Sequence, residues 1–248
     1  MASEIPVEQL KALWQEAFGD SPEFIEDFFR LAYSPEHCRV LRQDGTAAAA
    51  LYWFDCTCGG AQMAYLYAVA TGVRFRNRGL CRALLENTLK ELTGLGYRAA
   101  LLSPATDSLQ DMYRKLGFSP ACGLGFREAA VGTSALSVQA VTPEVYAAAR
   151  LRLLPPGGVQ QALPFFQVLG LDSRLFVGDG FVLAARQEGD VLSVQDFLGD
   201  TSAAPGILVA LGCRTGRFPQ SGGGDAPVFF RRLSPTAPVP RYFGPVLD

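Results

Sequence analysis

The sequence is poor in two side chains that often carry chemistry, since it has one histidine, His37, and three lysines. A serine or cysteine hydrolase needs a basic partner for its nucleophile, and here His37 would have to be that partner. His37 precedes Cys38, and adjacent side chains in an extended chain point to opposite sides, so we interpret His37 as a partly exposed loop residue. The other 19 of the 22 basic residues are arginines, so an arginine is informative only through its position.

The sequence also lacks the features of exported, membrane-spanning and nucleic-acid-binding proteins. It has no run of about 18 uncharged apolar residues, which argues against a membrane-spanning helix. The first ten residues lack the basic region and apolar run of a secretory signal. The net charge of −2 argues against general nucleic-acid binding, which normally needs a basic excess. The six cysteines follow no disulfide framework, so we expect a cytoplasmic protein.

Metal binding is not expected either. Cys56 and Cys58 form a short CxC, but no second pair lies at metal-ligand spacing, and a structural zinc site usually needs four ligands. We interpret both cysteines as small residues of a strand or hairpin. The sequence leaves the oligomeric state open, and a homo-oligomer is compatible with it.

The composition is that of a globular protein, with 49% apolar and 19% charged residues over 248 positions. In the first half, apolar periodicity and turn residues predict an α/β fold with a mixed sheet. Asp44 and Gly45 predict a tight turn between the first two strands. Helices are expected over 7–18, 21–33, 80–95 and 108–118, and strands over 38–43, 46–55, 61–73 and 97–105.

The second half repeats part of this plan. Residues 181–200 predict a strand, a turn and a strand, as residues 39–55 do. A helix over 206–213 and a strand over 227–233 are expected to follow. The matched order predicts a degenerate second copy of the first fold. We therefore expect two domains, residues 1–128 and 129–248.

Four arginines, Arg74, Arg76, Arg78 and Arg82, surround Gly79 where the third strand is followed by a helix. The first N–H groups of a helix lack internal partners, and the helix dipole adds positive potential, so a helix start binds phosphate groups well. Glycine lets the backbone approach a phosphate closely. The first turn holds no acidic residue, although acidic residues usually stabilise it. The loop is therefore either a phosphate site or a basic surface helix start.

A second motif helps to separate these alternatives. One strand after the loop, a predicted helix ends in Tyr113-Arg114-Lys115-Leu116-Gly117-Phe118. Together the two motifs resemble the GCN5-related N-acetyltransferase (GNAT) superfamily, whose loop has Arg or Gln, two residues, Gly, one residue, then Gly or Ala. Here the loop reads Arg76-Asn77-Arg78-Gly79-Leu80-Cys81, in which the small Cys81 is a mild departure. The resemblance covers residues 5–120 and implies that family's fold, with the first copy intact.

The resemblance implies acetyl-coenzyme A as co-substrate, bound in a splay between two parallel strands. It places the pantetheine arm on backbone groups of Val69, Ala70 and Thr71, and the pyrophosphate on the amides of residues 76–81. Tyr113 would then be the general acid that protonates the leaving thiolate. The alternative for Tyr113 is a core tyrosine with a satisfied hydroxyl.

The resemblance also suggests where the acceptor and the base lie. Aromatic residues recur at helical spacing in the first two helices, and most are expected in the core. In the family the loop between these helices flanks the acceptor site, so Phe28, Phe29 and Tyr33 are candidates for lining it. The central strand has no carboxylate or histidine to act as base. The apolar chain end is expected to be docked, which makes Asp248 a candidate base; the alternative is a final strand that completes the second sheet.

These features predict an N-acetyltransferase that moves an acetyl group to a primary amine by direct attack. The acceptor is a small molecule or a peptide lysine, and neither a nucleic acid nor a membrane is expected as partner. The tandem plan is similar to that of the enhanced-intracellular-survival acetyltransferases. Two alternatives stay open: a non-catalytic acyl-coenzyme A sensor, and a partner-binding protein with a decayed site.

Overall fold

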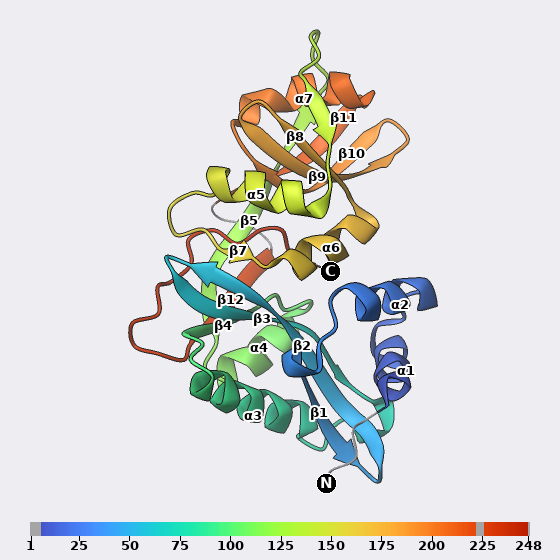
Figure 1. The fold of residues 1–248 in the computed structure, drawn as a ribbon, viewed down its shortest axis with the longest axis vertical. Helices are drawn as coiled ribbons and strands as arrows, with labels where there is room; N and C mark the ends of the chain where they lie inside the picture. The colour runs from blue at the N-terminus through green and yellow to red at the C-terminus, as the bar shows by residue number, and fades with distance from the viewer. Residues whose placement is uncertain (1–5, 222–225, 248) are drawn as a thin grey trace.

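The central feature of the fold is a mixed β-sheet to which both halves of the chain contribute, with helices on both faces (Figure 1). The computed structural model describes residues 6–221 and 226–247. Its strands are β1 (Cys38–Gln43), β2 (Thr46–Cys58), β3 (Ala61–Thr71), β4 (Ala99–Leu102), β5 (Ser119–Ala130), β6 (Val138–Ala140), β7 (Gln160–Gln161), β8 (Arg174–Gly178), β9 (Phe181–Glu188), β10 (Val191–Leu198), β11 (Thr215–Ser221) and β12 (Ala226–Arg232). Its helices are α1 (Val7–Phe18), α2 (Pro22–Leu31), α3 (Leu80–Gly94), α4 (Asp107–Lys115), α5 (Pro143–Leu153), α6 (Leu163–Asp172) and α7 (Ala204–Leu211), with short 3₁₀ helices η1 (Pro35–His37), η2 (Val73–Phe75) and η3 (Thr201–Ala203).

The helices and strands expected in the first half are present, and their ends have local causes, whereas β5 was not expected from the sequence. Ser21 caps α2 by accepting a hydrogen bond from the backbone N–H of Phe24 at 3.1 Å, and Pro22 occupies the first turn. Asp44 and Gly45 have positive φ angles of 52° and 75°, which the tight β1–β2 hairpin requires. Local side-chain chemistry thus sets these boundaries.

The two halves exchange strands at the centre of the sheet. The strand order is β1-β2-β3-β4-β12-β5-β11-β10-β9-β8-β6, and β7 pairs with β2. Strand β12 of the second half therefore lies between β4 and β5, while β5 continues onward to pair with β11. The strand expected over 227–233 is confirmed, but its place in the sheet of the first half follows from tertiary contacts. The expected domain boundary at 128 and 129 falls inside β5.

Both halves contain a hairpin followed by a helix and a parallel strand. In the first half β2 and β3 form the hairpin, and α3 leads to β4, which is parallel to β3. In the second half β9 and β10 form the hairpin, and α7 leads to β11, which is parallel to β10. The strand, turn and strand expected over 181–200 are therefore present as β9 and β10.

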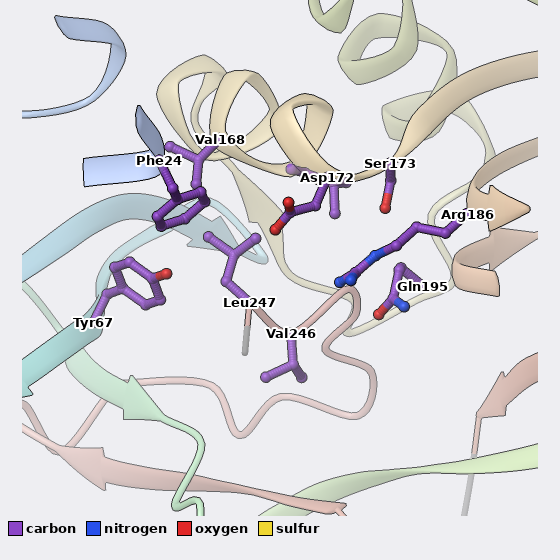
Figure 2. A pocket seen from close by; sticks show the side chains of 10 residues that line it. Phe24, Tyr67, Val168, Asp172, Ser173, Arg186, Gln195, Val246 and Leu247 are labelled. Atoms are coloured by element: carbon purple, nitrogen blue, oxygen red, sulfur yellow. The ribbon is translucent and has the colours of Figure 1, made fainter. Parts of the chain in front are cut away.

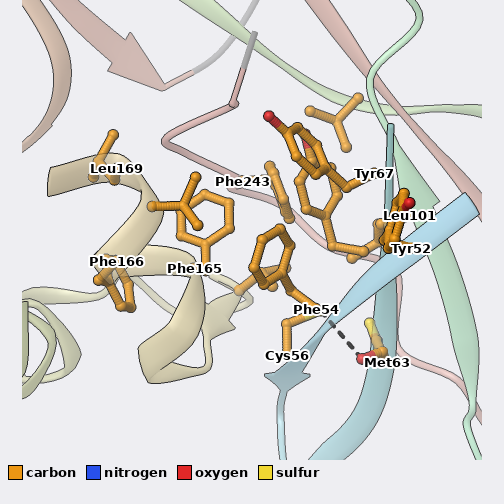
Figure 3. Close-up of a cluster of buried hydrophobic side chains, with 14 of the residues drawn as sticks. Tyr52, Phe54, Cys56, Met63, Tyr67, Leu101, Phe165, Phe166, Leu169 and Phe243 are labelled. Carbon is orange, nitrogen blue, oxygen red and sulfur yellow. Dashed lines mark hydrogen bonds between the residues drawn. The ribbon is translucent and has the colours of Figure 1, made fainter. Parts of the chain in front are cut away.

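Three buried clusters hold the layers together. The largest lies under α1, α2, α5 and α6 and combines residues of both halves (Figure 3). The ring of Phe165 in α6 lies 5.4 Å from that of Phe54 and 5.9 Å from that of Tyr65, and the ring of Phe243 lies 4.8 Å from Tyr65. The second cluster packs α3 and α4 on the other face of the sheet, and the third packs α7. Side chains of the second half therefore complete the core of the first.

Phe229 allows the strand exchange to be tested. Its side chain is 0% exposed in the cluster beneath α3 and α4, although it belongs to β12. We expect Phe229→Ala to lower the free energy of unfolding by about 3–5 kcal/mol, the usual cost of emptying a buried phenylalanine site. Phe126→Ala, at an exposed position of β5, is the control and should lower it by about 1 kcal/mol or less. Urea unfolding followed by tryptophan fluorescence measures both, and equal small losses would contradict the burial of β12 in the first half.

His37 ties the start of β1 to β2. Its Nε2 lies 3.5 Å from Oδ2 of Asp55, and its ring meets that of Trp53 edge-on at 5.3 Å. The hydrogen bond with Asp55 raises the pKa of His37 above its ordinary value, against the lowering effect of partial burial. The interpretation of His37 as partly exposed is confirmed, since 33% of its side chain is exposed.

Because His37 is the sole histidine, its NMR signal reports this pKa directly. We expect a native midpoint above about 6.5 and a return toward that pKa in Asp55→Asn. The folded state favours protonated His37, so this contribution to stability is complete below about pH 6.5 and is lost as the pH rises through the native pKa. A native pKa at or below 6.5 would exclude the stabilising pair.

Candidate active site

Strands β3 and β4 diverge and open the cavity that forms the candidate site. They pair in parallel over residues 63–65 and 99–101. Beyond this point β3 carries a bulge, because its register on β2 shifts between Tyr67 and Ala70 and Ala68 takes a φ of 47°. A bulge bends its strand and increases the local twist, so the following residues of β3 turn away from β4.

The space between the diverging strands is a cavity of about 480 Å³. Its walls come from α1, β3, the end of β4, α4 and the end of the chain, and they include the expected residues Val69 and Tyr113. Ala70 continues β3 and is 4% exposed. The hydroxyl of Thr71 is buried beside the thiol of Cys81. Burial raises the pKa of that thiol, and a hydrogen bond with Thr71 acts in the opposite direction.

The arginine-rich loop ends in an open helix start. Helix α3 begins at Leu80 without a side-chain cap and without an acidic residue in its first turn. Gly79 has a φ of 75°, which residues with a Cβ rarely adopt, and a Cβ built there would meet no atom within 4 Å. Asn77 also has a positive φ, of 60°. The first N–H groups of α3 therefore adjoin open space and can bind an anion.

Contacts within the loop hold three of its arginines near this helix start. The guanidinium groups of Arg74 and Arg78 lie 5.4 and 5.8 Å from the ring centre of the buried Phe75. Arg76 donates from Nε to the carbonyl of Thr71 at 3.3 Å. The loop thus places positive charge beside free N–H groups, an arrangement that suits a pyrophosphate.

The corresponding helix of the second half, α7, has a crowded first turn. The N–H of Gly132 donates to the carbonyl of Pro205 at 3.1 Å, and a Cβ built on Gly206 would lie 2.7 Å from the side chain of Leu136. Like α3, α7 has no side-chain cap, since Asp200 caps the preceding η3 by accepting the backbone N–H of Ser202 at 2.9 Å. Residues 132–136 thus pack against the first turn of α7, whereas a Cβ on Gly79 before α3 would meet open space.

Tyr113 lies in the cavity wall on α4 and is 6% exposed. Burial raises the pKa of its hydroxyl, and the nearby thiol of Cys81 adds to the rise. Tyr113 therefore stays protonated over the physiological pH range and has a proton to donate.

Strand β12 holds the helix that carries Tyr113. Arg231 donates to the carbonyl of Leu116 at the end of α4, and a cation there also complements the helix dipole. The guanidinium of Arg114 lies 5.4 Å from the ring centre of Phe229. A strand of the second half thus fixes the position of the candidate acid.

The aromatic residues of α1 and α2 divide between the core and the cavities. Phe28 is 1% exposed, and its ring lies 4.4 Å from that of Trp14. The rings of Phe29 and Tyr33 lie 4.8 Å apart at the edge of the same cluster. The aromatic residues of α1 and α2 that line a cavity are instead Trp14, Phe18 and Phe24. Helical spacing alone did not distinguish these residues from Phe28, Phe29 and Tyr33.

A second, smaller cavity of about 20 Å³ adjoins the first (Figure 2). Tyr67, Val246 and Leu247 line both cavities. The second half contributes the charged side chains of Asp172 and Arg186 to the smaller one. Sequence reasoning expected the chain end to be docked but did not place Tyr67, Asp172 or Arg186 at a cavity, since nothing local to these three residues indicates that distant segments meet here.

The chain end is docked, as predicted, because Tyr242 and Phe243 are 4% and 1% exposed. Asp248, the candidate base, lies outside the described residues. In the described wall of the larger cavity the carboxylate is that of Asp20, which accepts a hydrogen bond from the indole N–H of Trp14 at 2.7 Å.

The described ranges, 6–221 and 226–247, hold no group of three or more His, Cys, Asp or Glu side chains placed to bind a metal ion. Over the same ranges no helix has both the length and the apolar character needed to cross a membrane. Cys56 and Cys58 are free thiols on β2 and are buried, as expected for small strand residues.

Comparisons with known proteins bear on both the fold and the family. The family model of an acetyltransferase (GNAT) domain matches residues 2–121. A search of curated proteins finds no significant match. A GCN5-related N-acetyltransferase from Anabaena variabilis has a TM-score of 0.75 at 18% identity, covering 94% of this chain and 72% of that one. Eis1 from Mycobacterium abscessus has a TM-score of 0.67 at 15% identity, covering 91% and 71%. A tandem GNAT protein from the clavulanic acid biosynthesis pathway has a TM-score of 0.55 at 13% identity, covering 93% and 96%.

At these identities the structural likeness shows the fold alone, while the family model covers the bulged strand, the arginine-rich loop and the helix that carries Tyr113. Residues 2–121, just under half of the chain, thus match the acetyltransferase (GNAT) domain family.

Proposed function

We propose that the chain is an N-acetyltransferase that moves an acetyl group from acetyl-coenzyme A to a primary amine by direct attack. The observation that carries the proposal is the combination of the open start of α3 with a cavity between β3 and β4 that has Tyr113 in its wall. The match of residues 2–121 to the GNAT family model supports acyl transfer in general. A decayed partner-binding site is less favoured because both motifs and the cavity are retained, and a sensor without turnover is less favoured because the candidate acid Tyr113 lies in the cavity wall.

The first half has features that fit the co-substrate. The amides of residues 76–81 would hold the pyrophosphate, since open space lies before Gly79. Backbone groups of residues 69–71 would pair with the pantetheine arm, because the bulge turns this part of β3 away from β4. When bound, the coenzyme supplies an activated acetyl thioester.

In the proposed reaction the amine nitrogen attacks the thioester carbon, and the bond from that carbon to sulfur breaks. Tyr113 gives its proton to the departing sulfur, and its raised pKa keeps it protonated until then. The amine loses a proton to a base, for which Asp248 and the terminal carboxylate are our candidates. Val246 and Leu247 support this choice, because they bring the chain end to the cavity wall. Two carboxylates close together would raise one pKa, which suits a base near neutral pH.

We propose further that residues 129–248 are a degenerate copy of the domain at 1–128, without a coenzyme site. The series β8, β9, β10, α7 and β11 follows the order of β1, β2, β3, α3 and β4. The crowded first turn of α7 supports the absence of a pyrophosphate site in the copy. The acceptor would be a small-molecule amine or a peptide lysine, near the cluster of Phe28, Phe29 and Tyr33 beside Trp14.

Gly79→Glu tests the coenzyme loop. The variant places a carboxylate where the pyrophosphate would sit, so binding of acetyl-coenzyme A should weaken by roughly 2–4 kcal/mol in calorimetry. Gly180→Glu is the matched control, because Gly180 has a φ of 76°, also has no atom within 4 Å of a built Cβ, and lies in the β8–β9 hairpin. Both variants should lower the free energy of unfolding by similar amounts, and only Gly79→Glu should weaken the binding of acetyl-coenzyme A. Near-native affinity in Gly79→Glu would remove this loop from the proposal.

Tyr113→Phe tests the acid and the activity. We expect turnover to fall by roughly 10²–10⁴-fold while affinity for acetyl-coenzyme A stays nearly constant, because the hydroxyl serves the leaving thiolate. A screen of primary amines for release of free coenzyme thiol measures turnover. Tyr97→Phe is the control, since the Tyr97 hydroxyl bonds Asp55 at 2.5 Å and Trp53 at 3.2 Å, away from the cavity. Coenzyme binding without thiol release for any amine would support the sensor alternative instead.

A further inference from the structure

The tail of the chain follows a defined path between the two halves. The backbone N–H of Arg241 donates to the carbonyl of Gly157 at 2.8 Å, and the N–H of Val159 donates to the carbonyl of Tyr242 at 2.9 Å. The tail therefore runs beside residues 157–159 before it reaches the cavities.

Two buried side chains then hold the carbonyl groups of the tail. Arg150 and the amide of Gln161 both donate to the carbonyl of Gly244, the amide at 3.2 Å, and Gln161 also donates to the carbonyl of Pro245 at 3.4 Å. The fit at Gly244 is close, because a Cβ there would lie 2.8 Å from the hydroxyl of Tyr242. This part of the tail is therefore fixed in position as well as buried.

A fully buried ion pair anchors these contacts. Arg150 and Asp196 are 0% exposed and meet at 2.8 Å, and the hydroxyls of Tyr146 and Tyr242 donate to the same carboxylate at 2.8 and 3.1 Å. A buried ion pair rarely stabilises a fold more than an apolar pair of similar volume would. A guanidinium, however, can also donate to a tail carbonyl, which an apolar side chain cannot do. We name Arg150, Asp196 and Gln161 the tail clamp.

The two described residues that follow the clamped carbonyls, Val246 and Leu247, lie in the walls of both cavities. Figure 2 shows Leu247 beside Tyr67, which also lines both cavities. The smaller cavity of about 20 Å³ has room for about one water molecule. A ligand that fills the larger cavity therefore meets these two side chains where it faces the smaller cavity.

We propose that the tail clamp positions Val246 and Leu247 as a wall that limits the size of the acceptor amine. The inference rests on the proposed acetyltransferase function. The clamp residues act through the tail and are absent from the walls of both cavities, so they are positioning residues.

Two variants and a control test this wall. Leu247→Ala shortens the wall itself, and Gln161→Met removes the clamping amide while it keeps an unbranched side chain. Val239→Ala is the control, at a position of the same tail that is 44% exposed. The readouts are the ratio of kcat/KM for a branched amine to that for a short linear amine, the affinity for acetyl-coenzyme A, and hydrogen exchange of residues 242–247.

Leu247→Ala should raise the ratio by about tenfold or more, with unchanged coenzyme affinity. Gln161→Met should speed exchange of the tail by about tenfold and raise the ratio as well, while Val239→Ala should change neither. An unchanged ratio in Leu247→Ala, or a loosened tail with an unchanged ratio in Gln161→Met, overturns the inference. Loss of a base would look different, because deleting Asp248 should lower kcat for both amines alike.

The clamp also has a readout that does not depend on turnover. If none of the amines tested leads the native protein to release coenzyme thiol, the proposed function fails and so does the size limit. Hydrogen exchange of the tail still reports on the clamp in that case. Slow native exchange that becomes fast in Gln161→Met supports the clamp. Equal rates in the two proteins overturn it, whether or not the protein turns over.

Discussion

The pairing of β12 with β4 is the interaction on which the rest of the structure depends. It places a strand from near the end of the chain in the middle of the first half's sheet. From there Phe229 fills the core beneath α3 and α4, and Arg231 holds the end of the helix that carries Tyr113. Strand β5 in turn pairs with β11, so the sheet of each half is completed by the other. The candidate acid is thus held by contacts that a separate first half would lack.

Each half contains a β-bulge, and the two bulges have different structural consequences. In β3 the bulge at Ala68 turns the strand away from β4, and a cavity opens. In β10 the register on β9 shifts at Gln195, and the next residue, Asp196, is buried against Arg150. The first bulge accompanies an open helix start, and the second accompanies a helix whose first turn is crowded by residues 132–136. In our proposal this difference separates the copy that binds the coenzyme from the copy that holds the chain end.

The proposed site needs regions of opposite polarity, and distant segments supply them. Positive charge and free N–H groups at the start of α3 suit an anionic co-substrate. Around Tyr113 the wall contains apolar side chains such as Leu109 and Leu247, and burial keeps the phenol protonated. An apolar wall also favours the neutral form of an amine, which is the form that attacks a thioester. The clamped tail therefore fits the chemistry of the site as well as its shape.

The sequence by itself determined the helices of the first half, its strands up to β4 and the two motifs of the candidate site. These depend on short-range causes, such as apolar spacing, the cap at Ser21 and the φ that Gly79 must adopt. The tertiary structure decided three further features. It placed β12 between β4 and β5, it put Phe24 rather than Phe28 in a cavity wall, and it paired Arg150 with Asp196, 46 residues away. A strand does not encode its partner, and helical spacing does not say which apolar face meets a cavity. A buried ion pair likewise has no local pattern, because its energy exists only after both groups leave water together.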